Sequence, residues 1–260
     1  MKRGFVQTRL GPIHYREDGA GPPLVLLHRT AESGQQFDDV LPCLARGFRA
    51  VATDTPGFGD SAAPSSPPGI DGYAKNLVEA LDALGITRTH LLGHRTGASI
   101  AVEVAAQYPE RVDRLVLSGC PDYTDEERQA LDVPRYERSL SSDGSHLGNR
   151  WARTRANLGA GVSPAQLQRS FLMGQRAAPA PHWAYEAVYA QNIHSRLDQI
   201  AVPTLLLYGE RDPFARWLPE LTSHLADVRT VLIPGAHALT MYHTPEEFCR
   251  IVTEFLGAAG

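Results

Sequence analysis

The chain has 260 residues, 43% of them hydrophobic, and its 25 Lys and Arg against 29 Asp and Glu leave a formal net charge of −4. This length and apolar content predict one domain with a large core, and the absence of a clustered Lys/Arg stripe argues against a nucleic-acid or anionic-membrane partner. No apolar run is long enough to span a bilayer, no signal peptide begins at Met1, and three widely spaced cysteines do not predict a disulfide framework, so we expect a cytoplasmic protein.

The predicted elements begin with an antiparallel hairpin, because residues 5–17 alternate apolar and polar around Gly11-Pro12. From Leu24 onward, short apolar runs that predict strands alternate with helical patterns. The strand runs are 24–28, 48–53, 90–93, 114–118, 204–208 and 229–233, and the helical patterns are 34–45, 72–84, 96–107 and 245–256. This alternation predicts right-handed crossovers and a mostly parallel sheet.

The start of the last helix carries its own signal. Residues 244–247 read Thr-Pro-Glu-Glu, which is a capping box with proline at the first helical position. We therefore expect Thr244 to cap a helix that begins at Pro245.

A turn with an unusual central residue lies between the run 90–93 and the helical pattern 96–107. It reads Gly93-His94-Arg95-Thr96-Gly97. In the motif Gly-x-Ser-x-Gly, this context presents a nucleophilic serine on a strained strand-to-helix turn. Arg95 stands at the serine position, and a guanidinium cannot attack a carbonyl because it stays protonated and has no free lone pair. The usual serine acyl-enzyme route is therefore excluded there.

Four further segments occur in a characteristic order along the chain. They are Leu24–His28, the loop Asp-Thr-Pro-Gly-Phe-Gly-Asp-Ser at 54–61, the segment 205–212 that ends in Asp212, and Ile-Pro-Gly-Ala-His at 233–237. With the turn around Arg95, these segments resemble proteins of the α/β-hydrolase fold over nearly the whole chain. The resemblance implies an α/β protein with a mostly parallel, eight-stranded sheet flanked by helices.

Between about residues 121 and 199 the strand pattern disappears, and charged and aromatic helical segments replace it. By the same resemblance, this insertion after the sixth strand is a helical cap on a core formed by residues 1–120 and 200–260. Caps of this family close over the strand tips and line the substrate pocket. Candidates for that lining, each of which would otherwise pack within the cap, are His146, Trp151, Trp183, Tyr185, Tyr189 and His194.

The resemblance also assigns an acid and a base. His237 lies where the family places its catalytic base, and Asp212, four residues after its strand, lies where the family places the orienting carboxylate. Such a carboxylate fixes the histidine tautomer and leaves the other ring nitrogen free for proton transfer. Asp122, after the sixth predicted strand, is a second candidate acid and ranks below Asp212. The alternative is that His237 and Asp212 are ordinary loop residues.

The loop that would bind an oxyanion departs from the family pattern. His28-Arg29 stands where the family has His-Gly, and that glycine allows a bend that points the next amide, here Thr30, at the oxyanion. A side chain at Arg29 restricts this bend. Thr96 still supplies the amide that follows the central residue of the turn, so half of the oxyanion site is expected to remain.

Two arginines, Arg29 and Arg95, lie on loops that converge at one end of the expected sheet. They predict a cationic pocket for a carboxylate or another oxyanion, together with His28, His94 and His237. The alternative is that Arg29 turns outward and pairs with Glu32 or Asp38 on the surface.

Members of the family include hydroxynitrile lyases and cofactor-free dioxygenases, in which histidine acts mainly as a general base. We therefore expect an enzyme in which His237, oriented by Asp212, abstracts a proton while Arg95 holds an oxyanion of a small carbonyl- or carboxylate-bearing substrate. Water attack would give a hydrolase, and proton abstraction alone would give a lyase, dehydratase or cyclase. The alternative is a non-catalytic binding or receptor module. No cofactor and no metal are expected, because the His and Asp residues do not fall at ligand spacing, and the sequence does not predict an oligomeric state.

Overall fold

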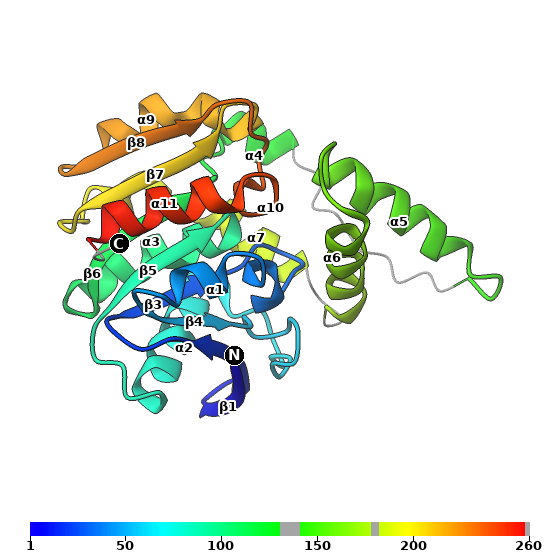
Figure 1. Ribbon diagram of the computed structural model, residues 1–260, viewed down its shortest axis with the longest axis horizontal. Coiled ribbons are helices and arrows are strands. Elements are labelled where there is room, and N and C mark those ends of the chain that lie inside the picture. Colours follow the sequence, from blue (N-terminus) through cyan, green and yellow to red (C-terminus); the bar gives the residue numbers. More distant parts are fainter. Residues whose placement is uncertain (131–140, 178–181, 258–260) are drawn as a thin grey trace.

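An eight-stranded sheet forms the centre of the computed structural model, which describes residues 1–130, 141–177 and 182–257 (Figure 1). The strand order is β1-β2-β4-β3-β5-β6-β7-β8, antiparallel for β1–β2 and β2–β4 and parallel for the remaining pairs. The strands are β1 (Lys2–Thr8), β2 (Gly11–Asp18), β3 (Pro23–Leu27), β4 (Arg49–Thr53), β5 (Thr89–His94), β6 (Val112–Ser118), β7 (Thr204–Gly209) and β8 (Val228–Ile233). The mostly parallel, eight-stranded sheet predicted from the sequence is confirmed.

Alternating side chains along the central strands build two cores, one on each face of the sheet. In β3, Val25 and Leu27 pack into the core under α2 (Gly69–Ala83) and α3 (Thr96–Gln107). Leu24 and Leu26 pack on the opposite face with α1 (Leu41–Leu44) and α11 (Pro245–Leu256). Because these strands are buried on both faces, each is a continuous run of apolar residues in the sequence, and their positions could therefore be predicted from it.

Three of the four predicted helices are confirmed as α2, α3 and α11. The fourth is wrong: residues 34–45 form the 3-10 turn η1 (Gly34–Phe37) and the short helix α1 rather than one helix. Pro42 is the ninth residue of that range, and a proline inside a continuous helix lacks an N–H and clashes with the carbonyl four residues earlier.

The prediction of a capping box at Thr244 is confirmed for the start of the helix but wrong for the side-chain cap. Helix α11 begins at Pro245 as expected, but the Thr244 side chain makes no cap hydrogen bond. Its hydroxyl instead donates to the Thr240 carbonyl at 3.1 Å, because the short helix α10 (Thr240–His243) ends immediately before it.

The described residues between β6 and β7 form helices, with no strand among them. These are α4 (Asp125–Ala130), α5 (Ser145–Leu158), α6 (Pro164–Arg176), α7 (His182–Ala190) and α8 (Ile193–Leu197). Figure 1 shows α5 and α6 projecting to one side of the sheet, whereas α7 lies against the sheet-bearing part of the molecule. After β7 follow η3 (Pro213–Trp217) and α9 (Leu218–Ser223). Among the described residues, no helix is both long and apolar enough to cross a membrane.

Candidate active site

Arg95 occupies a left-handed turn between β5 and α3. Its φ of 54° and ψ of −116° make it the only described non-glycine residue with positive φ. Holding a side-chain-bearing residue there costs about 1–3 kcal/mol, so the surrounding structure must enforce it. The Arg95 amide donates to the Ser118 carbonyl at 3.0 Å, which fixes the turn to the end of β6.

Close backbone approach explains the two glycines that flank the turn. A Cβ at Gly93 would lie 2.2 Å from the Gly97 carbonyl oxygen, and a Cβ at Gly97 would lie 2.1 Å from that of Leu27. Both distances are far below contact, so only glycine fits. The Gly-x-x-x-Gly spacing thus aims the residue-95 side chain away from the sheet edge and toward the loops after β6 and β7.

The Arg95 side chain binds Asp212. Its Nη2 donates to Asp212 Oδ1 at 2.7 Å, and its Nη1 donates to the Gly119 carbonyl at 3.2 Å. The guanidinium also lies over the Phe214 ring, 3.6 Å from the centroid. Arg95 therefore neutralises the carboxylate that the resemblance assigned to His237.

Asp212 is completely buried at its side chain and caps η3. Its Oδ1 accepts both Arg95 and the Phe214 amide, the latter at 2.9 Å. Its Oδ2 is buried and has no hydrogen-bond partner among the described residues. A buried carboxylate oxygen without a donor is costly, so Oδ2 marks a position where a donor would be accepted.

His237 lies on the loop after β8, beside the loop that carries Asp212. The two loops are joined by the Arg211 amide, which donates to the Ala236 carbonyl at 2.9 Å. In the described part of the chain no hydrogen bond links His237 to Asp212 or to Asp122. The ring instead meets His243 edge to face, with centroids 5.3 Å apart. The structure thus brings the loops of the predicted dyad together without forming its hydrogen bond.

On the predicted oxyanion loop, Thr30 and Thr96 contact each other. Their hydroxyls lie 2.8 Å apart, and the Thr30 amide points to Thr96 Oγ1 at 3.4 Å. Thr96 is the first residue of α3, so its amide has no partner within the helix. The Thr96 amide therefore stays a candidate oxyanion donor, whereas the Thr30 amide already faces a hydroxyl.

His28 and His94 do not contribute free imidazoles to a pocket. His28 accepts the Thr55 amide at Nε2 and contacts the Arg29 carbonyl through Nδ1, and burial lowers its pKa. His94 is fully buried with Nδ1 3.0 Å from Ser118 Oγ. Burial, together with the nearby charges of Arg95 and Arg29, holds the pKa of His94 well below its usual value. Both rings are therefore neutral, which corrects the prediction of three histidines in a cationic pocket.

Arg29 combines elements of the two alternatives left open by the sequence. It pairs with Glu32 at 2.9 Å, but this pair is covered rather than on the surface, because the Glu32 side chain is 3% exposed. Glu32 also accepts the hydroxyls of Ser170 from α6 and Tyr242 from α10. Arg29 thus joins a polar cluster between the sheet-bearing part and α6.

The aromatic and histidine side chains proposed for a pocket separate into two groups. Tyr185 on α7 faces the oxyanion loop, since its hydroxyl donates to the Thr30 carbonyl at 3.4 Å, and Tyr189 stacks on it. The others lie elsewhere. Trp151 is 37% exposed against Phe171, His146 bonds to Ser141, Trp183 contacts His182, and His194 pairs with Asp122 at 2.9 Å.

An aromatic cluster beside Arg95 was not identified from the sequence. Tyr123 lies at its centre and makes edge-on contacts with Tyr189, Phe214 and Trp217. Phe214 connects this cluster to the Arg95 guanidinium. Its position two residues after Asp212 was the available signal, but nothing in the local pattern showed which way the ring points.

Comparison with known proteins agrees with this architecture. The family model described as "alpha/beta hydrolase fold" matches residues 22–243. A pimeloyl-[acyl-carrier protein] methyl ester esterase of Nitrosospira multiformis is 27% identical over 91% of this chain and 95% of its own length. A 2-hydroxy-6-oxononadienedioate/2-hydroxy-6-oxononatrienedioate hydrolase of Comamonas testosteroni is 24% identical over 94% and 91%.

Among solved structures, a hydrolase from Pseudomonas aeruginosa superposes with a TM-score of 0.82 at 28% identity, over 99% of both chains. These relatives are hydrolases, which supports an enzyme. The segments that carry the resemblance, strands β3 to β8 and the positive-φ turn at residue 95 all lie within the matched range. The chain belongs to the α/β-hydrolase fold family.

Proposed function

We propose that the protein is an enzyme that works without a covalent intermediate, with His237 as general base and Arg95 as an anchor for an oxyanion of the substrate. The observation that carries this proposal is the position of Arg95: the turn of the nucleophile is kept, but its side chain is a guanidinium bound to a completely buried Asp212. A guanidinium offers five N–H donors, and two of the Arg95 nitrogens are engaged by protein oxygens.

Asp212 Oδ2 is the acceptor that we assign to His237. Oδ2 is buried without a partner, and the loop of His237 lies against the loop of Asp212. This assignment requires a His237 side-chain rotamer that turns the ring away from His243 and toward Oδ2, while Arg95 stays on Oδ1. The carboxylate would then orient the imidazole, while Arg95 balances its negative charge.

In the hydrolytic form of this reaction, His237 takes a proton from water and the resulting hydroxide adds to the substrate carbonyl carbon. Arg95 and the Thr96 amide hold the oxyanion that forms. The intermediate then collapses, the bond to the leaving group breaks, and the imidazolium returns its proton to that group. General-base catalysis contributes about 10²–10⁴ and one oxyanion donor about 10²–10³, which suffices for an activated substrate.

The substrate class that we propose is a small molecule with both a carbonyl and a carboxylate group. Two features support it. The Arg95 guanidinium can bind a carboxylate or an oxyanion, and the Comamonas relative is named for substrates that are dioates with an oxo group. Because the Arg95–Asp212 pair has no net charge, it would select by hydrogen-bond geometry more than by attraction to negative charge.

The test uses four variants and a reagent that labels nucleophilic serines. Wild-type protein, offered 6-oxo-dienoates and activated esters, should turn over at least one of them and resist a fluorophosphonate. His237→Ala should reduce turnover by about 10²-fold or more, whereas His182→Ala on α7 should leave it unchanged. Arg95→Ser should become fluorophosphonate-reactive, and Arg95→Ser/His237→Ala should not. Unaltered turnover in His237→Ala would exclude the assigned base.

A non-catalytic binding module is favoured by one observation, the ion pair itself. Arg95 engages the acid that His237 would use, and the pair fills the position of the nucleophile. The same experiment separates the two functions, because a binding module would bind these compounds without turning any of them over. It would also give an unreactive Arg95→Ser variant if His237 cannot reach Asp212.

A further inference from the structure

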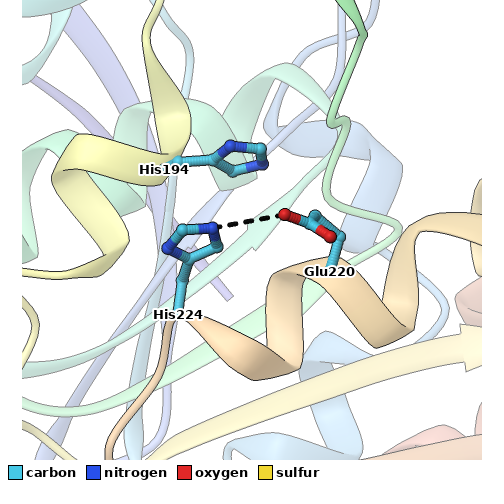
Figure 2. A group of neighbouring side chains, drawn as sticks. All are labelled: His194, Glu220 and His224. Atoms are coloured by element: carbon cyan, nitrogen blue, oxygen red, sulfur yellow. Dashed lines mark ion pairs between the residues drawn. The ribbon is translucent and has the colours of Figure 1, made fainter.

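A second cluster of ionisable side chains lies at the base of the insertion between β6 and β7. His194 comes from α8, and Glu220 and His224 come from α9 and its C-terminal cap (Figure 2). One ligand atom from each lies within 4.8 Å of the other two. Glu220 and His224 are four residues apart and therefore share one face of the helix. We propose that His194, Glu220 and His224 bind a divalent transition-metal ion of the zinc class.

The spacing of the ligand atoms fits this size of ion. Zinc binds imidazole nitrogen and carboxylate oxygen at about 2.0–2.2 Å, so two tetrahedral ligands lie about 3.4 Å apart. His224 Nε2 and Glu220 Oε1 are 3.5 Å apart. The His194 and His224 rings stack with centroids 4.3 Å apart and 11° between their planes. The in-plane lone pairs of two parallel rings do not converge, so the His194 ring would have to turn out of this stack to complete a three-ligand site with a fourth position for water.

Two carboxylates that are not among the three proposed ligands, those of Asp198 and Asp122, contact the histidine rings. Asp198 Oδ1 lies 2.8 Å from His224 Nδ1, so Nδ1 carries the proton in the neutral ring and the lone pair of Nε2 faces Glu220. Asp122 contacts His194 Nε2 at 2.9 Å. Carboxylates that bond to metal-binding imidazoles orient the ring and raise its basicity. Asp122 would thus either orient His194 or serve as the fourth ligand.

The charge of the cluster also calls for a cation. Three carboxylates, from Asp122, Asp198 and Glu220, surround two imidazoles. One divalent ion would offset the negative charge of two of these carboxylates.

Imidazole ligands also restrict the kind of metal. Two nitrogen ligands and a carboxylate suit zinc and its neighbours, whereas magnesium and calcium prefer oxygen ligands. The ligands are reachable from solvent, since the His194 and His224 side chains are 37% and 23% exposed. By contrast, the group His14, Asp54 and Asp60 is mostly buried, and the Asp54 carboxylate already accepts His14 and the amides of Gly34 and Asp60.

The location suggests what the ion would do. Asp122 lies four residues after the end of β6, where the insertion begins, and His194 lies near its end, before β7. An ion held by His194, Glu220 and His224 would tie α8 to α9 and, through Asp122, hold both ends of the insertion together. The proposed ligands include neither Arg95 nor His237, so the proposal does not depend on the proposed function.

The experiment titrates the metal-stripped full chain with zinc alone, by calorimetry and thermal unfolding, and with Co²⁺ by absorption spectroscopy. Wild type should bind one Zn²⁺, show the visible bands of tetrahedral Co²⁺, and melt roughly 5 °C higher at a hundredfold excess over Kd. Asp198→Asn should weaken binding by about 10–100-fold. His194→Ala and His224→Ala should abolish the Co²⁺ bands, while His182→Ala should bind like wild type.

Two results would overturn the proposal. One is wild-type protein that gives no binding heat, no Co²⁺ bands and no change in melting temperature. The other is a His194→Ala/His224→Ala variant that binds zinc as tightly as wild type, because the ion would then lie elsewhere. Far-ultraviolet circular dichroism of each variant in the absence of metal establishes that a loss of binding is not a loss of fold.

Discussion

The turn at Arg95 and helix α6 are stabilised by different interactions. At the turn, backbone atoms approach so closely that only glycine fits at 93 and 97, and the Arg95–Asp212 pair is mostly buried, with the Arg95 guanidinium against the Phe214 ring. Helix α6 is held mainly by polar side chains. It follows that the turn is a fixed part of the core, whereas α6 can be released by conditions that leave the core folded.

The contacts of α6 show this directly. Arg169 binds Asp39 through two hydrogen bonds, at 2.9 and 2.6 Å, and Gln166 binds the same carboxylate at 2.8 Å. Ser170 donates to Glu32, and Arg176 pairs with Asp60. Apolar burial on this helix is limited, although Met173 is 2% and Leu167 8% exposed. Partly exposed ion pairs of this kind are weaker and more sensitive to salt and acid than packed apolar cores.

The largest effect is expected at Gly97. In Gly97→Ala the new methyl group would collide with the backbone of Leu27 in β3, which cannot move without breaking the sheet. We expect a loss of more than about 4 kcal/mol in the free energy of unfolding, measured by urea denaturation. A cost near 1 kcal/mol would mean that the turn is far more adaptable than its geometry indicates.

The next effect concerns the buried ion pair. Arg95→Met keeps the Cβ and therefore the backbone strain, but it leaves Asp212 as an unpaired charge with no exposed side-chain surface. We expect a loss of about 3–5 kcal/mol in urea denaturation. Arg95→Met/Asp212→Asn should recover part of it, because the buried group is then neutral. If the single and double variants lose the same free energy of unfolding, the unpaired charge of Asp212 is not the cause of the loss.

A smaller, pH-dependent effect is expected where α6 docks. Burial by itself would raise the pKa of Asp39, but the hydrogen bonds from Arg169 and Gln166 outweigh it and leave the pKa below its usual value. Because the folded-state pKa is the lower one, this contribution is present at neutral pH and is lost as the pH falls below about 4. Asp39→Asn should cost about 1 kcal/mol at pH 7 and nothing at low pH.

The measurement for Asp39 is the difference in urea stability between wild type and variant across this pH range. Hydrogen exchange at neutral pH should show the loss of protection concentrated in 141–177 and not in β5 or α3. Uniform loss of protection over the whole chain would contradict the separate behaviour of α6.

The smallest expected effect on stability is a gain rather than a loss, and it concerns Gly148. Gly148 lies within α5, has no positive φ, and a Cβ there would meet no atom within 4 Å. Gly148→Ala should stabilise α5 by about 0.5–1 kcal/mol, because alanine loses less backbone entropy in a helix. Slower hydrogen exchange in α5 would measure this gain. Faster exchange would show that Gly148 is needed for a contact, as Gly97 is.

Much of the architecture and of the turn could be predicted from the sequence. Continuous apolar runs indicated the parallel strands, and the spacing of Gly93 and Gly97 around Arg95 indicated the strand-to-helix turn. These features could be predicted because each depends on the local backbone. Strand and helix patterns alternate along the chain, glycine is required where atoms approach closely, and proline is favoured where a helix starts. The same local reasoning failed at 34–45, where the effect of Pro42 was overlooked.

The partners of the charged side chains were decided only by the tertiary structure. Arg95 and Asp212 are 117 residues apart, and their pairing in place of a bond between His237 and Asp212 depends on which loops meet over the sheet edge. His194 was a candidate for the pocket lining, with packing inside the cap as the alternative, yet it stacks on His224, the C-terminal cap residue of α9, beside Glu220. The sequence determined on which strand end, loop or helix each side chain is placed. Only the folded chain determined which groups face each other, because buried charges take the nearest partner that removes the cost of their desolvation.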